Sequence, residues 1–138
     1  MKKKLLFIVA GGIIVIAAAL ALLPSGPPQP TAEEEAALTA LKSIQEGYGS
    51  RVTYEKYAAL LDAAAQKIDQ LKKAGTQNSC LMNAVERSYS SFEMGEKAWK
   101  AKDEALDENR RIDMETTLSF TIGFASISLA KANECFYK

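Results

Sequence analysis

The chain has 138 residues, of which 48% are apolar and 25% charged, a composition typical of one small globular domain and not of a disordered or multi-span membrane protein. It contains 17 basic and 17 acidic residues, but three of the lysines lie at positions 2–4; the rest of the chain has 14 basic against 17 acidic residues, a net charge of −3 that does not favour nucleic acid. There is no histidine, which excludes the commonest general base and metal ligand.

The first 23 residues have the pattern of an export signal. Lys2, Lys3 and Lys4 precede an uncharged apolar run, Leu5–Leu23, whose basic start is expected to stay in the cytoplasm. Nineteen apolar residues form a helix of about 28 Å, close to the thickness of a bilayer core, which favours a retained membrane anchor. Ala19 and Ala21 also allow cleavage by a signal peptidase, so both outcomes stay open. Residues 24–30 contain four prolines and predict a stiff spacer.

The remaining residues, 31–138, predict an all-α domain, an antiparallel up-down bundle of four helices. Thr31 and Glu34 form a capping-box pattern at the start of the first helix, and Thr53 is the expected cap of the second. Apolar residues then recur at intervals of three and four, which is the spacing of a bundle seam. We expect the helices at residues 32–47, 54–74, 79–106 and 114–137.

The last segment is ambiguous, because Leu118, Phe120, Ile122 and Phe124 alternate as in a strand. We favour a helix, since a single strand would have no partner for its backbone groups. Its apolar residues on several faces predict a helix surrounded by three neighbours. The inward positions of such a helix are Leu118, Ile122, Ala125, Leu129, Ala132 and Phe136.

Cys80 and Cys135 are placed symmetrically about position 107.5, inside the polar stretch 107–111 that we predict as the turn between the last two helices. An antiparallel hairpin about this point brings the two cysteines together, and in an exported protein an even pair predicts a disulfide rather than two buried thiols. The same symmetry places Phe92 opposite Gly123 and Gly95 opposite Phe120, a matching of large with small residues.

Four aromatic residues are the candidate binding residues: Tyr54, Tyr57, Tyr89 and Trp99. Their helical spacing favours a role in the core, with a ligand or partner pocket as the alternative. Glu93 and Glu96 lack the histidine partners that a di-iron bundle requires. We therefore expect no catalytic residue, no metal site and no cofactor.

The middle of the chain, residues 52–102, resembles a loose group of small exported helical domains in bacterial proteins. This resemblance implies a bacterial envelope setting and no particular activity. The following residues carry it: Val52, Tyr54, Tyr57, Leu60, Leu61, Ala64, Ile68, Asp69, Tyr89, Ala98, Trp99, Ala101 and Lys102.

Together these features predict a non-enzymatic domain that is exported, and either anchored in the inner membrane through Leu5–Leu23 and facing the periplasm or released into the periplasm or medium. The expected role is a scaffold or accessory subunit that binds an envelope protein or a second copy of itself. The alternative is a bundle that binds a small apolar ligand between its helices.

Overall fold

The computed structural model describes residues 29–136, and these residues form helices and connecting loops without any β-strand. The prediction of an all-α domain is therefore confirmed. The predicted leader, residues 1–23, lies outside the described residues, as does most of the proline-rich spacer. Within 29–136, none of the helices combines the length and the hydropathy needed to cross a membrane. The helices are α2 (Ala32–Gly49), α3 (Tyr54–Ala74), α4 (Ser79–Asp103) and α5 (Glu108–Glu134).

Polar side chains cap the start of each helix, as its unpaired N–H groups require. At α2 the Thr31 hydroxyl accepts from the Glu34 amide (3.2 Å), and the Glu34 carboxylate accepts from the Thr31 amide (2.9 Å), which confirms the capping box. The side chain of Thr53 accepts from the Lys56 amide at the start of α3, and that of Asn78 accepts from the Leu81 amide at the start of α4. The sequence thus determines three of the four helix starts through local hydrogen bonding.

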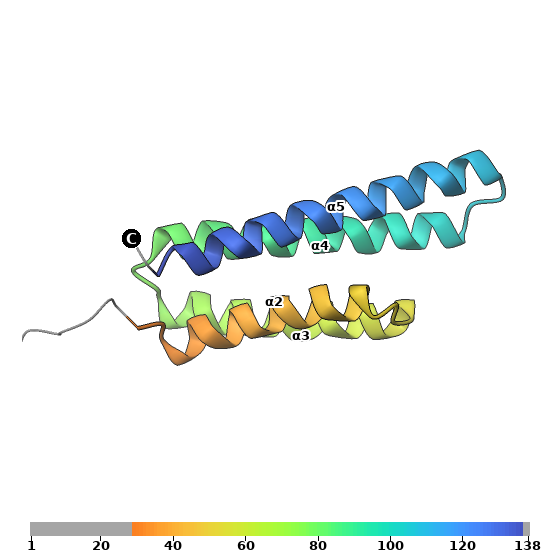
Figure 1. Ribbon diagram of the computed structural model, residues 1–138. Helices are drawn as coiled ribbons and strands as arrows, with labels where there is room; N and C mark the ends of the chain where they lie inside the picture. Colours follow the sequence, from red (N-terminus) through yellow and green to blue (C-terminus); the bar gives the residue numbers. More distant parts are fainter. Residues whose placement is uncertain (1–28, 137–138) are drawn as a thin grey trace, which may run out of the picture.

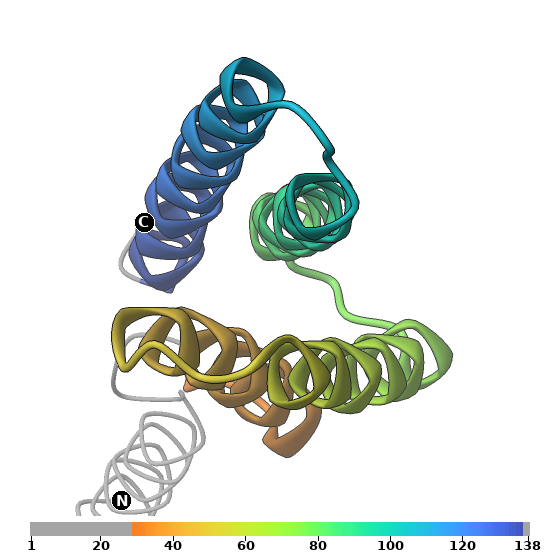
Figure 2. The same cartoon turned by 90° about the vertical axis from the view of Figure 1, so that its right-hand side faces the viewer.

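The four helices pack as two hairpins laid one on the other. Figure 1 shows that successive helices reverse direction, with the α2–α3 pair below and the longer α4–α5 pair above. Viewed along the helices, α4 and α5 cross over the α2–α3 layer (Figure 2). Among the described helices, α4 contacts each of the other three, whereas α5 contacts only α4 and α2.

The core lies between the two hairpins and contains apolar residues at the predicted spacing. In α3, the seam residues Tyr57, Leu61, Ala64, Ile68 and Leu71 are all buried. The predicted inward face of α5 is buried as well, from Leu118 to Phe136. The spacing of apolar residues therefore correctly predicts the buried side of α3 and of α5.

The second hairpin differs from its predicted bounds at the turn. Helix α4 ends at Asp103, so that Leu106, the last residue of the expected helix 79–106, lies in the loop and is fully exposed. Helix α5 begins at Glu108 rather than at the expected residue 114, and Asp107 is its cap. The polar run of 107–111 therefore forms the first turn of a helix, because exposed charged residues are as compatible with a solvated helix end as with a loop.

The predicted pairing of aromatic rings with glycines is wrong. Phe120 is 66% exposed, and Gly123 has no neighbour within 4 Å of the position of a Cβ atom. Gly95 instead faces Ile122 and Thr121. The symmetry about 107.5 predicts the correct level along the hairpin but not the side of the helix. Phe120 was expected opposite Gly95, whereas Ile122, which points about 200° away from Phe120 around the helix axis, lies there. The expectation that α5 is surrounded by three neighbours fails for the same residues, since part of its apolar surface faces solvent.

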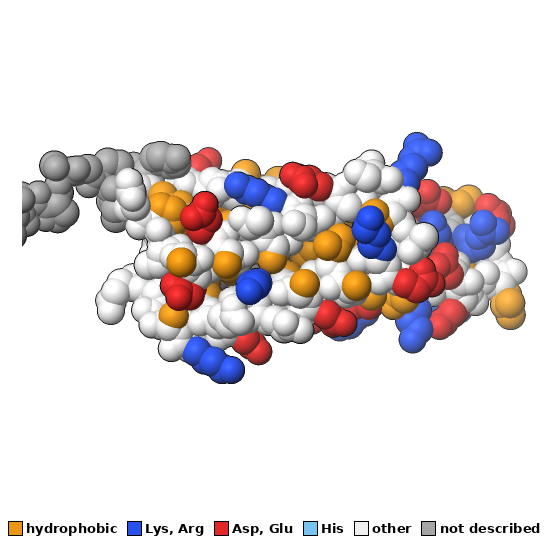
Figure 3. All heavy atoms as spheres, turned by 90° about the horizontal axis from the view of Figure 1, so that it is seen from below, with side chains coloured by type: hydrophobic (Ala, Val, Ile, Leu, Met, Phe, Trp, Pro, Cys, Tyr) orange, Lys and Arg blue, Asp and Glu red, His pale blue; other side chains and the backbone are white. Residues whose placement is uncertain are grey.

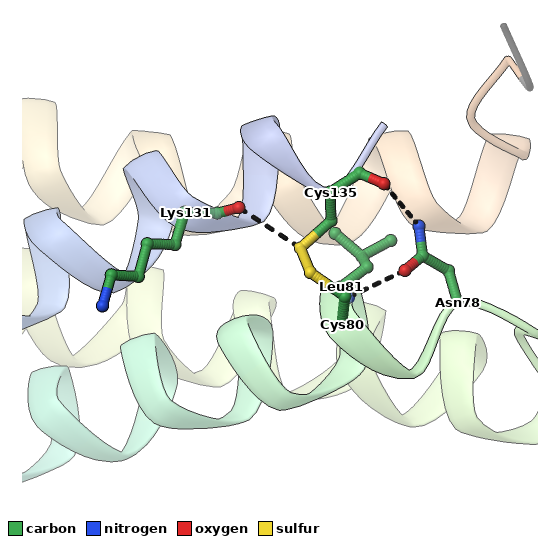
Figure 4. The surroundings of a disulfide bond; sticks show 5 residues. All are labelled: Asn78, Cys80, Leu81, Lys131 and Cys135. Carbon is green, nitrogen blue, oxygen red and sulfur yellow. Dashed lines mark hydrogen bonds between the residues drawn. A yellow bond between two sulfur atoms is a disulfide. The ribbon is translucent and has the colours of Figure 1, made fainter. Parts of the chain in front are cut away.

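A disulfide joins the ends of α4 and α5 away from their turn. The Cα atoms of Cys80 and Cys135 are 5.8 Å apart, and the bridge closes the hairpin as predicted. Figure 4 shows how Asn78 reinforces this end: its side chain accepts from the Leu81 amide (3.0 Å) and donates to the Cys135 carbonyl (3.2 Å). The Cys135 sulfur also lies 3.3 Å from the Lys131 carbonyl oxygen, a contact without a shared proton because a disulfide sulfur carries no hydrogen.

Candidate functional site

Three of the four predicted aromatic residues gather at the end of the bundle where α2 meets α3. The ring of Trp99, from α4, lies 5.5 Å from that of Tyr57 and 6.2 Å from that of Tyr54, centroid to centroid. Tyr48, at the end of α2, packs edge-on against the same indole at 6.2 Å. We call Tyr48, Tyr54, Tyr57 and Trp99 the aromatic cluster. It joins three helices, with distances and angles typical of stabilising ring pairs.

Hydrogen bonds fix the two tyrosines of α3 in the aromatic cluster. The Tyr57 hydroxyl donates to the Phe92 carbonyl (3.0 Å) in the buried core, and the Tyr54 hydroxyl donates to the Glu96 carboxylate (3.1 Å) near the surface. Burial raises the pKa of Tyr57 well above its ordinary value of 10.0, and slight desolvation with the Glu96 charge raises the pKa of Tyr54. Both phenols are therefore neutral at physiological pH, as residues of a packed core should be.

Tyr89, the fourth predicted residue, does not belong to the aromatic cluster. It lies on α4 about 15 Å along the helix from Trp99 and is half-buried against the core. Desolvation, with the negative charge of Glu93, raises the pKa of Tyr89 to about 12. The ring beside Trp99 that the prediction did not include is Tyr48, because the end of α2 packs against the indole.

An open cleft of about 630 Å³ lies beside the aromatic cluster. Trp99 and Tyr48 form one wall, and Arg51, Lys102 and Glu115 contribute charged groups at the rim. Of the four predicted aromatic residues only Trp99 lines it. Tyr57 is buried within the bundle, and Tyr54 is half-buried with its hydroxyl on Glu96. This cleft therefore does not bring the four rings together in one wall.

The outer face formed by α2 and α3 presents a shallow groove. Figure 3 shows small apolar side chains in a line between charged ones on this face. Ala36, Ala40 and Ala63 line the groove, with Glu35 and Lys67 beside them. Methyl groups between charges are typical of an ordinary helix surface, and nothing in the groove indicates a ligand.

The acidic residues that could suggest a metal site have other partners. Glu86 forms an ion pair with Lys72 (3.0 Å), and Glu96 accepts from Tyr54. Glu34 accepts hydrogen bonds from Thr31 and Thr76. Within residues 29–136, acidic residues and cysteines do not come together in any group of three or more that could hold a metal ion.

The main exposed apolar surface lies on α5. Phe120, Phe124 and Ile127 are 66%, 51% and 56% exposed, and the rings of the two phenylalanines lie 4.9 Å apart, centroid to centroid, with their planes tilted by 57°. They lie on the same side of the helix, roughly 150° around its axis from the buried face. We call these three residues the apolar stripe. Sequence analysis missed it, although its signal is present: the intervals of four and three that identify a seam occur twice in this helix.

Comparison of the chain with protein-family models, with curated proteins and with solved structures gives no match.

Proposed function

We propose that this chain is a non-enzymatic interaction domain, a scaffold or accessory subunit of the bacterial envelope that binds another protein through the apolar stripe of α5. The observation that carries the proposal is the exposure of Phe120, Phe124 and Ile127 on a helix whose other face is already packed. Exposure of large apolar side chains to water is unfavourable, and burial against a partner removes this cost. A contiguous exposed group of them marks an interaction site.

Chemistry at this surface favours binding over catalysis. The stripe lies in a stretch of α5, residues 116–130, that contains no charged residue, so it offers no acid, base or nucleophile of ordinary catalytic strength. The chain lacks histidine altogether, and the tyrosines with a shifted pKa are shifted upward, towards the unreactive neutral phenol. An uncharged helix face suits an apolar face on a partner, as in helix-in-groove recognition.

The proposed location outside the inner membrane is supported by the sequence and by the disulfide. Lys2–Lys4 and the apolar run Leu5–Leu23 form an export or anchor signal, and disulfides persist mainly in oxidising compartments. An anchored domain would expose the apolar stripe of α5 to neighbouring envelope proteins. A released domain would keep the same stripe in the periplasm.

Photo-crosslinking tests the interaction directly. In one variant of the full chain a benzophenone amino acid replaces Phe124 in the apolar stripe, and in a matched control it replaces Met94. Met94 is 54% exposed on α4 and is therefore equally accessible but outside the stripe. We expect a protein adduct on irradiation of living bacteria only from position 124. Equal adducts from both positions, or none from 124, would contradict the proposal.

The alternative function, binding of a small apolar ligand, is favoured by one observation, the cleft beside Trp99. Its rim carries Arg51, Lys102 and Glu115, so a ligand would need a polar end as well as an apolar one. Trp99 is the only tryptophan of the chain and reports on this cleft without labelling. Titration with a long-chain fatty acid should change its fluorescence with saturation if the cleft binds such ligands, and a flat titration excludes them.

A further inference from the structure

The apolar stripe belongs to a longer pattern on the solvent side of α5. Exposed residues recur at intervals of four, three, four, three and four, which is the alternation of a heptad repeat. A heptad seam on the outside of a helix has no function within its own bundle, because that helix already packs through its other face. We call these residues the outer seam: Asp113, Thr117, Phe120, Phe124, Ile127 and Lys131.

The charges of the outer seam indicate what covers it. Its apolar middle is bounded by an acidic residue at one end, Asp113, and a basic residue at the other, Lys131, and neither forms an ion pair within residues 29–136. Such a helix is complementary to itself when the second copy runs in the opposite direction. In a parallel pair, Asp113 would meet Asp113 and Lys131 would meet Lys131, a repulsive arrangement at both ends.

The heptad spacing also selects a register. In an antiparallel pair, one alignment brings Phe124 against Phe120 of the second copy, Ile127 against Thr117 and Lys131 against Asp113. The next possible alignment, seven residues away, would place Lys131 against Phe120 and Glu134 against Thr117, and it would bury charge beside apolar groups without a partner. Only the first alignment pairs apolar with apolar or neutral residues and opposite charges with each other.

We propose that two copies of this chain associate through the outer seams of their α5 helices, antiparallel and about a twofold axis at residue 122. The proposal rests on the interaction function proposed above and names its partner as a second copy. A twofold axis makes each contact occur twice, so both ends of the pair gain a Lys131–Asp113 contact.

The area of the outer seam predicts a reversible dimer. At their observed exposures, Phe120, Phe124 and Ile127 leave about 300 Å² of side-chain surface per copy in water. Two copies therefore bury about 600 Å² through these residues, and their neighbours add to it without reaching the roughly 1,600 Å² of a standard stable interface. We expect a monomer–dimer equilibrium that depends on protein concentration.

Sedimentation equilibrium of the full chain in detergent, over a concentration series, tests the pairing. We expect a monomer–dimer equilibrium whose dissociation constant rises at least about tenfold in Phe124→Glu and stays within about twofold in the control Met94→Glu. Phe120→Glu is a second stripe variant, and far-UV circular dichroism checks that each variant is folded. A monomer at all concentrations, or an equal effect of the stripe and control variants, would overturn the proposal.

Charge reversal tests the antiparallel register. Lys131→Glu and Asp113→Lys each create like charges at both ends of an antiparallel pair, so each alone should weaken the dimer several-fold, about tenfold at most. An equimolar mixture of the two variants should recover the affinity, because every end contact is then between opposite charges. A parallel pair predicts no loss in either single variant, and that result would overturn the register.

The two proposals can fail separately. If the wild-type chain is monomeric and position 124 still crosslinks to a different protein, then self-association is wrong and the interaction function stands. If the chain is monomeric and position 124 gives no adduct, both are wrong. An adduct at twice the mass of the chain, combined with the expected effects of charge reversal, supports both.

Discussion

Gly95 marks the point where α3 and α5 both approach α4, and its replacement by alanine tests how tightly the three helices meet. A Cβ atom at this position would lie 3.1 Å from Ile122 Cδ1, 3.2 Å from Thr121 Oγ1 and 3.2 Å from the Tyr57 hydroxyl oxygen. The Ile122 methyl can move, but the two oxygens are held by hydrogen bonds, from Thr121 to the Leu118 carbonyl and from Tyr57 to the Phe92 carbonyl. The added methyl therefore has no easy way to be accommodated.

The expected magnitude is the difference between two effects of opposite sign. Alanine in place of glycine within a helix stabilises it by about 1 kcal/mol, whereas overpacking a filled core costs about 1–3 kcal/mol. We expect Gly95→Ala to lower the free energy of unfolding by about 1 kcal/mol. Gly123→Ala is the matched control, since no atom lies within 4 Å of its added methyl, and it should raise stability by about 0.5–1 kcal/mol.

Urea unfolding followed by circular dichroism at 222 nm measures both variants at a low protein concentration. The expected separation between them is about 2 kcal/mol, well above the error of such titrations. Tyr57→Phe removes one of the close oxygens, so Gly95→Ala should cost less in that background than in the wild type. Equal stabilisation by both alanines would show that the helices leave room at Gly95, and the reasoning would then be refuted.

Three further predictions concern the covalent and polar links of the bundle. Replacement of Cys80 and Cys135 by serine opens a loop of 56 residues and should cost about 4 kcal/mol in urea unfolding; a loss below about 1 kcal/mol would contradict this account. Burial keeps the pKa of Tyr57 above its unfolded value near 10, so unfolded chains lose this proton first. The Tyr57 contribution to stability, measured as the difference between the wild type and Tyr57→Phe, should be constant below pH 9 and fall above pH 10 by at most about 1.4 kcal/mol per pH unit. Thr31→Ala removes the capping acceptor of α2 and should lower stability by about 1 kcal/mol in thermal unfolding, whereas an unchanged midpoint would exclude the cap as a stabilising element.

Local chemistry explains which features sequence analysis identified correctly. Caps at Thr31 and Thr53 depend on residues three positions apart, and the seam of α3 depends on a period of 3.6, so neither needs knowledge of the rest of the fold. The disulfide could also be predicted from the sequence, because the two cysteines are equidistant from a turn that the polar residues indicate. Tyr54, Tyr57 and Trp99, three of the four candidate binding residues, lie together in the structure, but the sequence pattern did not separate them from Tyr89.

The errors arise where several structures satisfy the same local pattern. Residues 107–111 are polar and suit either a loop or an exposed first turn, and the hairpin adopted the second. The addition of Tyr48 to the aromatic cluster and the exclusion of Tyr89 depended on where the end of α2 lies above Trp99. Helix crossings fix such contacts, and the spacing of residues within one helix carries no information about them.

The sequence by itself therefore determined the number of helices, most of their caps and their inward faces. Only the tertiary structure decided what happens to the second apolar face of α5. Phe120 and Phe124 have the spacing of core residues, and a period cannot distinguish a face that a neighbouring helix covers from one that it does not. Within residues 29–136, α5 contacts α4 and α2 alone, so no described helix covers this face. A residue pattern that would otherwise describe a core is then a surface available for binding.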